Sequence, residues 1–457
     1  MALPHELAPS VTGQLADLVL GIDSAFVSDD DLTKAETCFL DWCAVALAAV
    51  DDPIMRLMRN QAASEGGNPQ ARFLGSVQRG SAVQAALVNG VASHLYDYDD
   101  GASSIPGHPT VPVGSAVWAL GEREGVAGRD VLIGLIAGIE VMCRLGRALK
   151  PNHYAAGWHA SGTLGAIAAA AACSNLLKLD RQRTIWAIGL AACRSSGLKA
   201  VFGSSAKPLQ LGHAAALGLQ SADLAARGFD CASDVLEAEK GFLELHGSKF
   251  DADAIFKPLG HPLAIHEARF KRHAACFLTH ASTEGALAFR RAHNIGPDQI
   301  AKIHIVGHPE LKTVCGNWEP DGGLAFKFSA PMVVAAALSG IETGSLASFS
   351  ETNARDPRLR ALAAKVVIDT SDEFEQEESH LTFEMNDGQI FEIHGETARS
   401  APTAELDQES LLPKVRALLR PLYGETGMEA LITTFRELHN AARLPDIASN
   451  ASHAAAE

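Results

Sequence analysis

Four polar segments stand out from a largely apolar sequence because they are rich in side chains that bind carboxylates or move protons. They are residues 97–100 with 107–109, then 153–159, 199–210 and 271–280. Each segment lies beside glycine or proline, where a chain turns and side chains from different segments can converge. Aspartate, histidine, tyrosine and lysine are the groups of general acid–base catalysis. Their joint occurrence in these segments predicts acid–base chemistry.

Taken one at a time, the same residues also fit structural roles. Asp99 and Asp100 are as well suited to cap a helix or to lie in a loop as to act in catalysis. Cys276 suits core packing and the lining of a pocket equally well. The functional interpretation therefore depends on the whole set of residues and not on any one of them.

A metal site is the main alternative for the acidic segment. Its aspartates, together with His94 and His108, offer carboxylate and imidazole ligands that suit Mg²⁺, Mn²⁺ or iron. No second pair of histidine and aspartate has compact ligand spacing, so we predict no metal. The sequence also lacks the P-loop, G-x-G-x-x-G, H-E-x-x-H and G-x-S-x-G motifs, which argues against nucleotide-binding, zinc-protease and hydrolase functions.

The pattern of apolar residues is helical over most of the chain. From residue 10 to about residue 265, alanine and leucine dominate, and apolar residues recur at steps of three and four, which predicts packed helices. Residues 406–441 return to the same pattern.

The intervening part has short β-branched runs at 301–307 and 364–370. Residues 381–394 alternate apolar and polar side chains around Asn386-Asp387-Gly388, which predicts a β-hairpin. We therefore predict a mainly α fold, with a large all-α helical domain and a smaller α+β domain. The predicted bounds are 1–268 and 396–445 for the all-α domain, 269–395 for the α+β domain and 446–457 for a flexible tail.

Composition limits the partners and the compartment. With 54 acidic and 38 basic residues, the formal net charge is -16, so the overall field disfavours nucleic acids and anionic membranes. The eight cysteines include no C-x-x-C pair and lie mostly in apolar runs, as expected of buried thiols in a reducing cytoplasm. The first residues lack the basic and apolar regions of a signal peptide. We expect a cytoplasmic protein.

These segments, in order over roughly residues 30–370, resemble the MmgE/PrpD family, which includes 2-methylcitrate dehydratase, cis-aconitate decarboxylase and iminodisuccinate epimerase. The matching segments are 85–90, 94–100, 107–109, 138–141, 144–146, 157–159, 162–165, 202–203, 207–208, 327–329 and 356–357. The resemblance implies a large all-α domain built from both ends of the chain and a smaller α+β domain. It also implies a homodimer and catalysis without a metal or organic cofactor.

The resemblance also places the family's active-site groups on this sequence. The positions are Asp97, His108, Tyr154, His159, Lys207 and Lys271. Substrate contacts are predicted for Lys207, Lys271, Phe202, Gly203, Gln210 and Cys276. Two positions depart from the decarboxylase pattern, since Gly101 replaces a threonine and Cys276 replaces a histidine; the loop to His108 is also one residue shorter.

All three reactions of the family require a proton to leave or reach a carbon next to a carboxylate. We predict that the two lysines bind carboxylates and that His108 or His159 is the general base. Tyr154 would donate a proton, and Asp97 would orient a histidine.

The expected function is a cofactor-independent lyase for a small polycarboxylate. Dehydration of a 2-methylcitrate-like hydroxy acid is the reaction that we favour. Epimerisation of an iminodisuccinate-like dicarboxylate and cis-aconitate-type decarboxylation are alternatives. A catalytically silent carboxylate-binding scaffold is the alternative that is not an enzyme.

Overall fold

The structure is a computed structural model of the chain, and it describes residues 10–247, 250–293, 295–397 and 403–447. The chain forms two compact units. Among the described residues, the first unit contains 10–95, 99–270 and 403–447, and the second contains Tyr96–Tyr98 and 271–397. Most of the predicted tail, residues 448–457, lies outside the described part.

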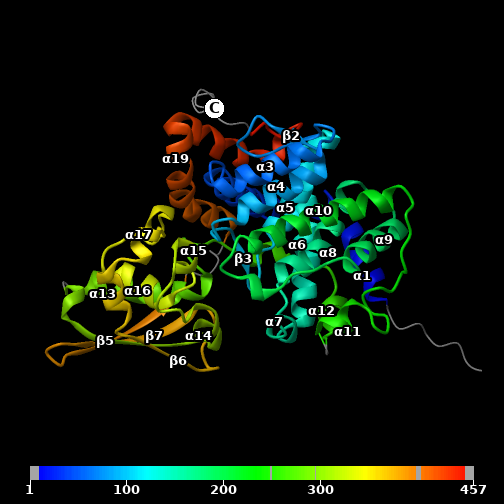
Figure 1. The fold of residues 1–457 in the computed structure, drawn as a ribbon. Helices are drawn as coiled ribbons and strands as arrows, with labels where there is room; N and C mark the ends of the chain where they lie inside the picture. Colours follow the sequence, from blue (N-terminus) through cyan, green and yellow to red (C-terminus); the bar gives the residue numbers. More distant parts are fainter. Residues whose placement is uncertain (1–9, 248–249, 294, 398–402, 448–457) are drawn as a thin grey trace, which may run out of the picture. The chain divides into compact units, whose positions relative to one another are not determined.

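The first unit is helical, which confirms the predicted mainly α class (Figure 1). Its α-helices are α1 (Val11–Gly21), α2 (Asp29–Ala48), α3 (Pro53–Glu65), α4 (Ala82–His94), α5 (Thr110–Glu124), α6 (Gly128–Leu149), α7 (Asn152–Ala155), α8 (Ala160–Leu176), α9 (Arg181–Ala192), α10 (Ala206–Ala226), α11 (Phe242–Gly247), α12 (Asp253–Phe256) and α19 (Ala404–Arg436). Short 3-10 turns are η1 (Lys199–Val201), η2 (Ala264–Glu267) and η6 (Leu438–Asn440). Two antiparallel strand pairs join β1 (Ala71–Arg72) to β2 (Arg79–Gly80) and β3 (Gly101–Ala102) to β4 (Ala268–Arg269).

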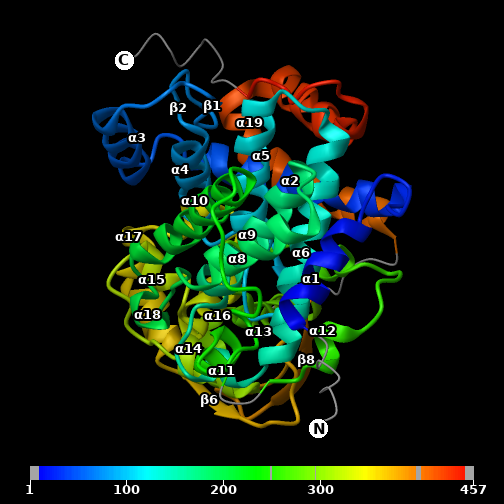
Figure 2. The same ribbon diagram turned by 90° about the vertical axis from the view of Figure 1, so that its right-hand side faces the viewer.

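Small residues allow the central helices of this unit to pack closely. Helix α8 is buried along almost its whole length and packs against α5, α6, α9 and α10. Figure 2 shows α8 among the helices of this unit. A Cβ added to Gly90 of α4 would lie 2.6 Å from the Cα of Gly212 in α10, so both positions need glycine at this crossing. A Cβ added to Gly165 of α8 would likewise come too close to the side chain of Pro112 in α5. The ends of α4, α5, α8 and α10 are thereby held in fixed positions.

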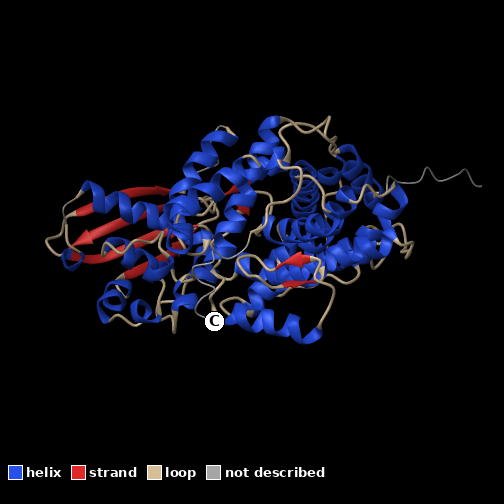
Figure 3. Cartoon of the chain, turned by 90° about the horizontal axis from the view of Figure 1, so that it is seen from above, coloured by secondary structure: helices blue, strands red, loops and turns tan. Residues whose placement is uncertain are grey.

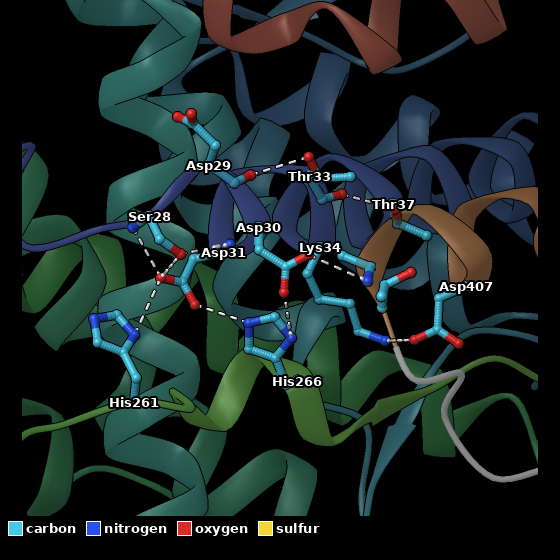
Figure 4. A network of polar contacts seen from close by, with 12 residues as sticks. Ser28, Asp29, Asp30, Asp31, Thr33, Lys34, Thr37, His261, His266 and Asp407 are labelled. Carbon is cyan, nitrogen blue, oxygen red and sulfur yellow. Dashed lines mark hydrogen bonds and ion pairs between the residues drawn. The ribbon is translucent and has the colours of Figure 1, made fainter.

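Helices α2 and α19 come from opposite ends of the chain and pack together. Buried ion pairs connect them: Lys34 with Asp407, and Lys414 with Asp41 at 2.5 Å (the first pair is drawn in Figure 4). The predicted helix 406–441 is interrupted, because Gly424 has φ 64° and ψ -176°, outside the helical region. None of the described helices combines the length and the apolar composition needed to cross a membrane.

The second unit contains the four-stranded sheet, drawn in red in Figure 3. The strands are β5 (Ile300–Gly307), β6 (Val366–Thr370), β7 (Glu378–Met385) and β8 (Ile390–Glu396), in the order β6-β5-β7-β8. Its helices are α13 (His280–Ala292), α14 (Pro309–Cys315), α15 (Gly323–Phe326), α16 (Ala330–Leu338), α17 (Glu351–Ala354) and α18 (Pro357–Ala363), with 3-10 turns η3 (Phe277–Thr279), η4 (Pro297–Gln299) and η5 (Leu346–Ser348).

Strand pairing in this sheet follows the sequence pattern. Strand β5 is parallel to β6 and antiparallel to β7, and β7 and β8 form the predicted hairpin. Gly388 turns the hairpin with φ 87°, a conformation that favours glycine. Helix α13 packs against β7 and β8, where Phe289 stacks on Phe383 with ring centroids 4.0 Å apart. The sheet therefore has its own apolar core.

Candidate active site

A buried carboxylate lies between two histidines in the first unit. His94 is the last residue of α4, and His108 lies two residues before α5 begins. Asp99 Oδ1 is 2.8 Å from Nδ1 of His94, and Asp99 Oδ2 is 3.0 Å from Nδ1 of His108. Nδ1 of His108 also lies 2.8 Å from the backbone oxygen of Asp100. The segment between α4 and α5 therefore folds back so that one aspartate contacts both rings.

The charges in this group follow from burial and from the neighbouring rings. Burial alone would raise the pKa of Asp99, but His108 and His94 outweigh it and hold that pKa well below its usual range. Burial lowers the pKa of His94 to about 4, against a partial opposing effect of Asp99. Burial raises the pKa of Asp100 well above its usual range. At neutral pH, Asp99 is therefore ionised and His94 is neutral.

His159 is placed at the start of α8 by hydrogen bonds on both sides. Its backbone N–H donates to Gly197 O, and its Nδ1 lies 2.6 Å from Oε1 of Gln210. The Gln210 amide in turn donates to Leu198 O at 3.3 Å, which fixes the direction of the amide. The predicted contact of Gln210 with substrate stays a prediction; in the structure its oxygen faces His159.

Phe202 and Lys207 complete this part of the first unit. The Phe202 ring meets the His159 ring edge-on, with centroids 4.9 Å apart, and Lys207 Nζ lies 5.2 Å from the Phe202 centroid. Lys207 is the second residue of α10 and is buried. Burial lowers the pKa of His159, and Lys207, His94 and His108 lower it further. The four predicted residues His108, His159, Phe202 and Lys207 therefore belong to one group.

Tyr154 contacts a different lysine. It lies on the short helix α7, and Lys199 Nζ stands 3.5 Å from the centroid of its ring and donates to its backbone oxygen at 3.2 Å. The neighbouring His153 is buried, with Nε2 2.7 Å from Thr163 Oγ1 and Nδ1 2.9 Å from His246 O. Burial lowers the pKa of His153 to about 4. The role of Tyr154 as a proton donor stays a prediction.

The remaining predicted residues belong to the second unit. Lys271 is buried, and its Nζ lies 3.2 Å from Oδ1 of Asp97 and donates to Asp97 O at 2.6 Å. Asp97 has φ 51°, a conformation uncommon for residues other than glycine. Tyr98 Oη donates to Arg272 O and Gly344 O, which ties residues 96–98 to this unit.

Two further side chains of the second unit have polar contacts near this pair. Cys276 lies beside Cys315; burial raises the pKa of the Cys315 thiol, and Cys276 and Asp97 raise it further. Lys327 donates to Tyr96 O and lies 5.6 Å from the centroid of the Phe349 ring. The roles predicted for Asp97, Lys271 and Cys276 stay predictions.

His94 and Asp99 were not among the predicted catalytic residues. The signal that could have found them is their position, since His94 ends a predicted helix and Asp99 follows five residues later in the same polar segment. Asp99 Oδ1 is hydrogen-bonded to Nδ1 of His94, and Oδ2 lies within ion-pair distance of Nδ1 of His108. The absence of a metal from the mechanism stays a prediction.

Comparison with known proteins defines the class. The family model of the MmgE/PrpD N-terminal domain matches residues 13–254, and that of the MmgE/PrpD C-terminal domain matches residues 273–440. The chain belongs to the MmgE/PrpD family, as its resemblance predicted. The second unit lies largely within the C-terminal match.

The chain is similar to proteins named cis-aconitate decarboxylase. It is 28% identical to that of Aspergillus terreus over 409 residues, which cover 83% of each chain. It is 25% identical to that of Mus musculus over 94% of this chain and 91% of the relative, and 25% identical to that of Homo sapiens over 94% and 92%. The family and these relatives are enzymes.

The two buried histidines with lowered pKa predict a stability that depends on pH. His94 and His153 have pKa values of about 4 in the folded chain, whereas an unfolded histidine titrates near about 6.5. As the pH falls from about 6.5 to about 4, the unfolded chain therefore binds protons that the folded chain does not. The free energy of unfolding should fall over this range in urea titrations.

His153→Gln should reduce this dependence on pH because it removes one of the titrating groups. Thr163→Val is the matched control, since it removes the same hydrogen bond and leaves the imidazole in place. The control should lower stability without changing the slope of stability against pH. A wild-type stability that is constant from pH 7 to pH 4 would contradict the assignment.

Proposed function

We propose that the protein is a lyase that acts on a small polycarboxylate by moving a proton at a carbon next to a carboxylate. Dehydration of a hydroxy acid similar to 2-methylcitrate is the first reaction to test. The observation that carries the proposal is the His94–Asp99–His108 group, which shares the first unit with buried His159 and Lys207.

This set of side chains contains the groups needed to remove a proton from carbon and to bind a carboxylate. The proton next to a carboxylate is weakly acidic, so a base must be held close to it and the negative charge that develops must be stabilised. A neutral imidazole is a base suited to neutral pH, and a buried ammonium group attracts a carboxylate strongly. We assign the base to His108 and the carboxylate contact to Lys207, with His159 available as a second proton carrier.

Dehydration would then proceed by elimination. His108 takes the proton from the carbon next to a carboxylate, the electron pair of that bond forms the double bond, and the bond to the hydroxyl group breaks. The hydroxyl group accepts a proton from Tyr154 and leaves as water. Lys271 belongs to the second unit, and its predicted contact with a carboxylate stays a prediction. Each of these roles is supported by residue type and by the resemblance.

Decarboxylation of cis-aconitate is the second candidate, and the names of the relatives favour it. In that reaction the bond to a carboxylate breaks, CO₂ leaves with the electron pair remaining on carbon, and a histidine returns a proton to that carbon. Gly101 and Cys276 count against it, because the decarboxylase pattern has threonine and histidine there. At identities of 25–28%, the relatives do not decide between the two reactions.

Proton NMR in D₂O tests the proposal. The full chain is incubated separately with 2-methylcitrate, citrate and cis-aconitate, each with and without EDTA. New vinyl signals from a hydroxy acid, unaffected by EDTA, are the expected result. Loss of a carboxyl group from cis-aconitate would establish the second candidate in place of the first. Unchanged spectra for all three compounds would refute the proposal.

The role of Lys207 can be tested with a matched pair of variants. Lys207→Ala should raise KM for the substrate at least about tenfold, because a charged hydrogen bond to a carboxylate contributes roughly 1.5–3 kcal/mol. Lys199→Ala removes a nearby lysine that contacts Tyr154 and not the Phe202 ring, and it should raise KM less. Equal effects of the two substitutions on KM would contradict the role of Lys207 in substrate binding. Thermal unfolding of both variants checks that the fold is intact.

A further inference from the structure

We infer that Asp99 is a positioning residue, which holds His108 as the tautomer protonated on Nδ1 and so presents Nε2 of His108 as the base. The inference rests on the proposed function. It assigns a role to Asp99, which is not among the catalytic residues of that proposal.

Hydrogen-bond chemistry fixes the tautomer of His108. Its Nδ1 faces two oxygens, Oδ2 of Asp99 at 3.0 Å and the backbone oxygen of Asp100 at 2.8 Å. An ionised carboxylate and a backbone carbonyl can only accept a hydrogen bond, so Nδ1 must be the donor. A neutral imidazole carries one proton on its two nitrogens, so the lone pair lies on Nε2. Only that nitrogen can take a proton from a substrate.

His94 completes the arrangement from the other side of the carboxylate. Its Nδ1 is 2.8 Å from Oδ1 of Asp99, so each oxygen of Asp99 faces one ring. Because His94 stays neutral to a pH of about 4, it orients the carboxylate without cancelling its charge. The full negative charge of Asp99 is therefore available to stabilise His108 when it becomes an imidazolium cation. The two rings meet edge-on with centroids 4.5 Å apart, which limits rotation of His108.

The other titratable groups near His108 in the first unit differ from Asp99 in charge or in the partners that they contact. From α10, Lys207 is a cation, and His159 at the start of α8 has its pKa lowered by burial. Asp100 is next in sequence, but its carboxyl group accepts from Thr110 Oγ1 at 2.6 Å and has a raised pKa. The Asp99 carboxylate lies 3.0 Å from Nδ1 of His108.

A second aspartate in the same unit provides a matched control. Asp31 is buried, and it also contacts two histidines: Oδ1 is 2.8 Å from Nε2 of His266, and Oδ2 is 3.5 Å from Nδ1 of His261 (Figure 4). It lies in the first turn of α2, where it forms a capping box with Ser28. Asp31→Asn thus removes a buried charge between two imidazoles without altering the contacts of His108.

The test compares Asp99→Asn with Asp31→Asn in the full chain. Both substitutions should lower the thermal stability, because both remove a buried, hydrogen-bonded carboxylate. Asp99→Asn should lower kcat on the active substrate by about 100-fold or more with a much smaller change in KM, since a misdirected base impairs proton transfer and not binding. Asp31→Asn should leave both kinetic constants near those of the wild type. A kcat for Asp99→Asn equal to that for Asp31→Asn would overturn the inference.

Nitrogen NMR of protein labelled with ¹⁵N-histidine provides a readout that needs no turnover. The His108 signals, assigned by their loss in His108→Gln, should show a protonated Nδ1 and an unprotonated Nε2 in the wild type and in Asp31→Asn. Asp99→Asn should weaken this preference, because the new side-chain amide can donate to Nδ1 and only the backbone oxygen of Asp100 then accepts from it. A protonated Nε2 in neutral wild-type His108 would overturn the inference. If no compound in the substrate panel reacts, the proposed function fails while the spectrum still decides the role of Asp99.

Discussion

One buried carboxylate organises the polar centre of the first unit. Asp99 is completely buried, and an ionised carboxylate in such a place is costly unless hydrogen bonds surround it. His94 supplies a hydrogen bond to Oδ1, and Nδ1 of His108 lies 3.0 Å from Oδ2. Because His94 ends α4 and His108 precedes α5, the same carboxylate also connects these helices. The need to satisfy one charge therefore fixes both the local fold and the direction in which an imidazole points.

Close packing of small residues places the other polar groups around that centre. The contact of Gly90 with Gly212 sets α4 against α10, and the contact of Gly165 with Pro112 sets α8 against α5. His159 precedes the first residue of α8, and Lys207 is the second residue of α10. The packing of these helices therefore determines the backbone position of both residues. Larger side chains at the glycine positions would separate the helices whose ends carry the chemistry.

Much of the fold could be predicted from periodicity, because the repeat of apolar residues differs between helices and strands. The helices and the β7–β8 hairpin follow that pattern. Residue type selected the polar segments, and the resemblance to the family placed His108, His159 and Lys207 within them. The partners of these residues could not be predicted. The polar segment contains aspartates at 97, 99 and 100. Only the path of the backbone decides which of them contacts a histidine, which pairs with a lysine and which has its pKa raised by burial. The bond from Gln210 to His159 joins residues 51 positions apart and has no local signal.

The domain matches establish the family, whereas the reaction depends on where a substrate lies against these side chains. A crystal structure of the full chain with bound citrate measures that position directly. We expect a carboxylate of citrate within about 4 Å of Lys207 Nζ and a carbon next to a carboxylate within about 3.5 Å of Nε2 of His108. Citrate bound elsewhere, with neither group in contact, would contradict the assignment of this group of residues as the active site.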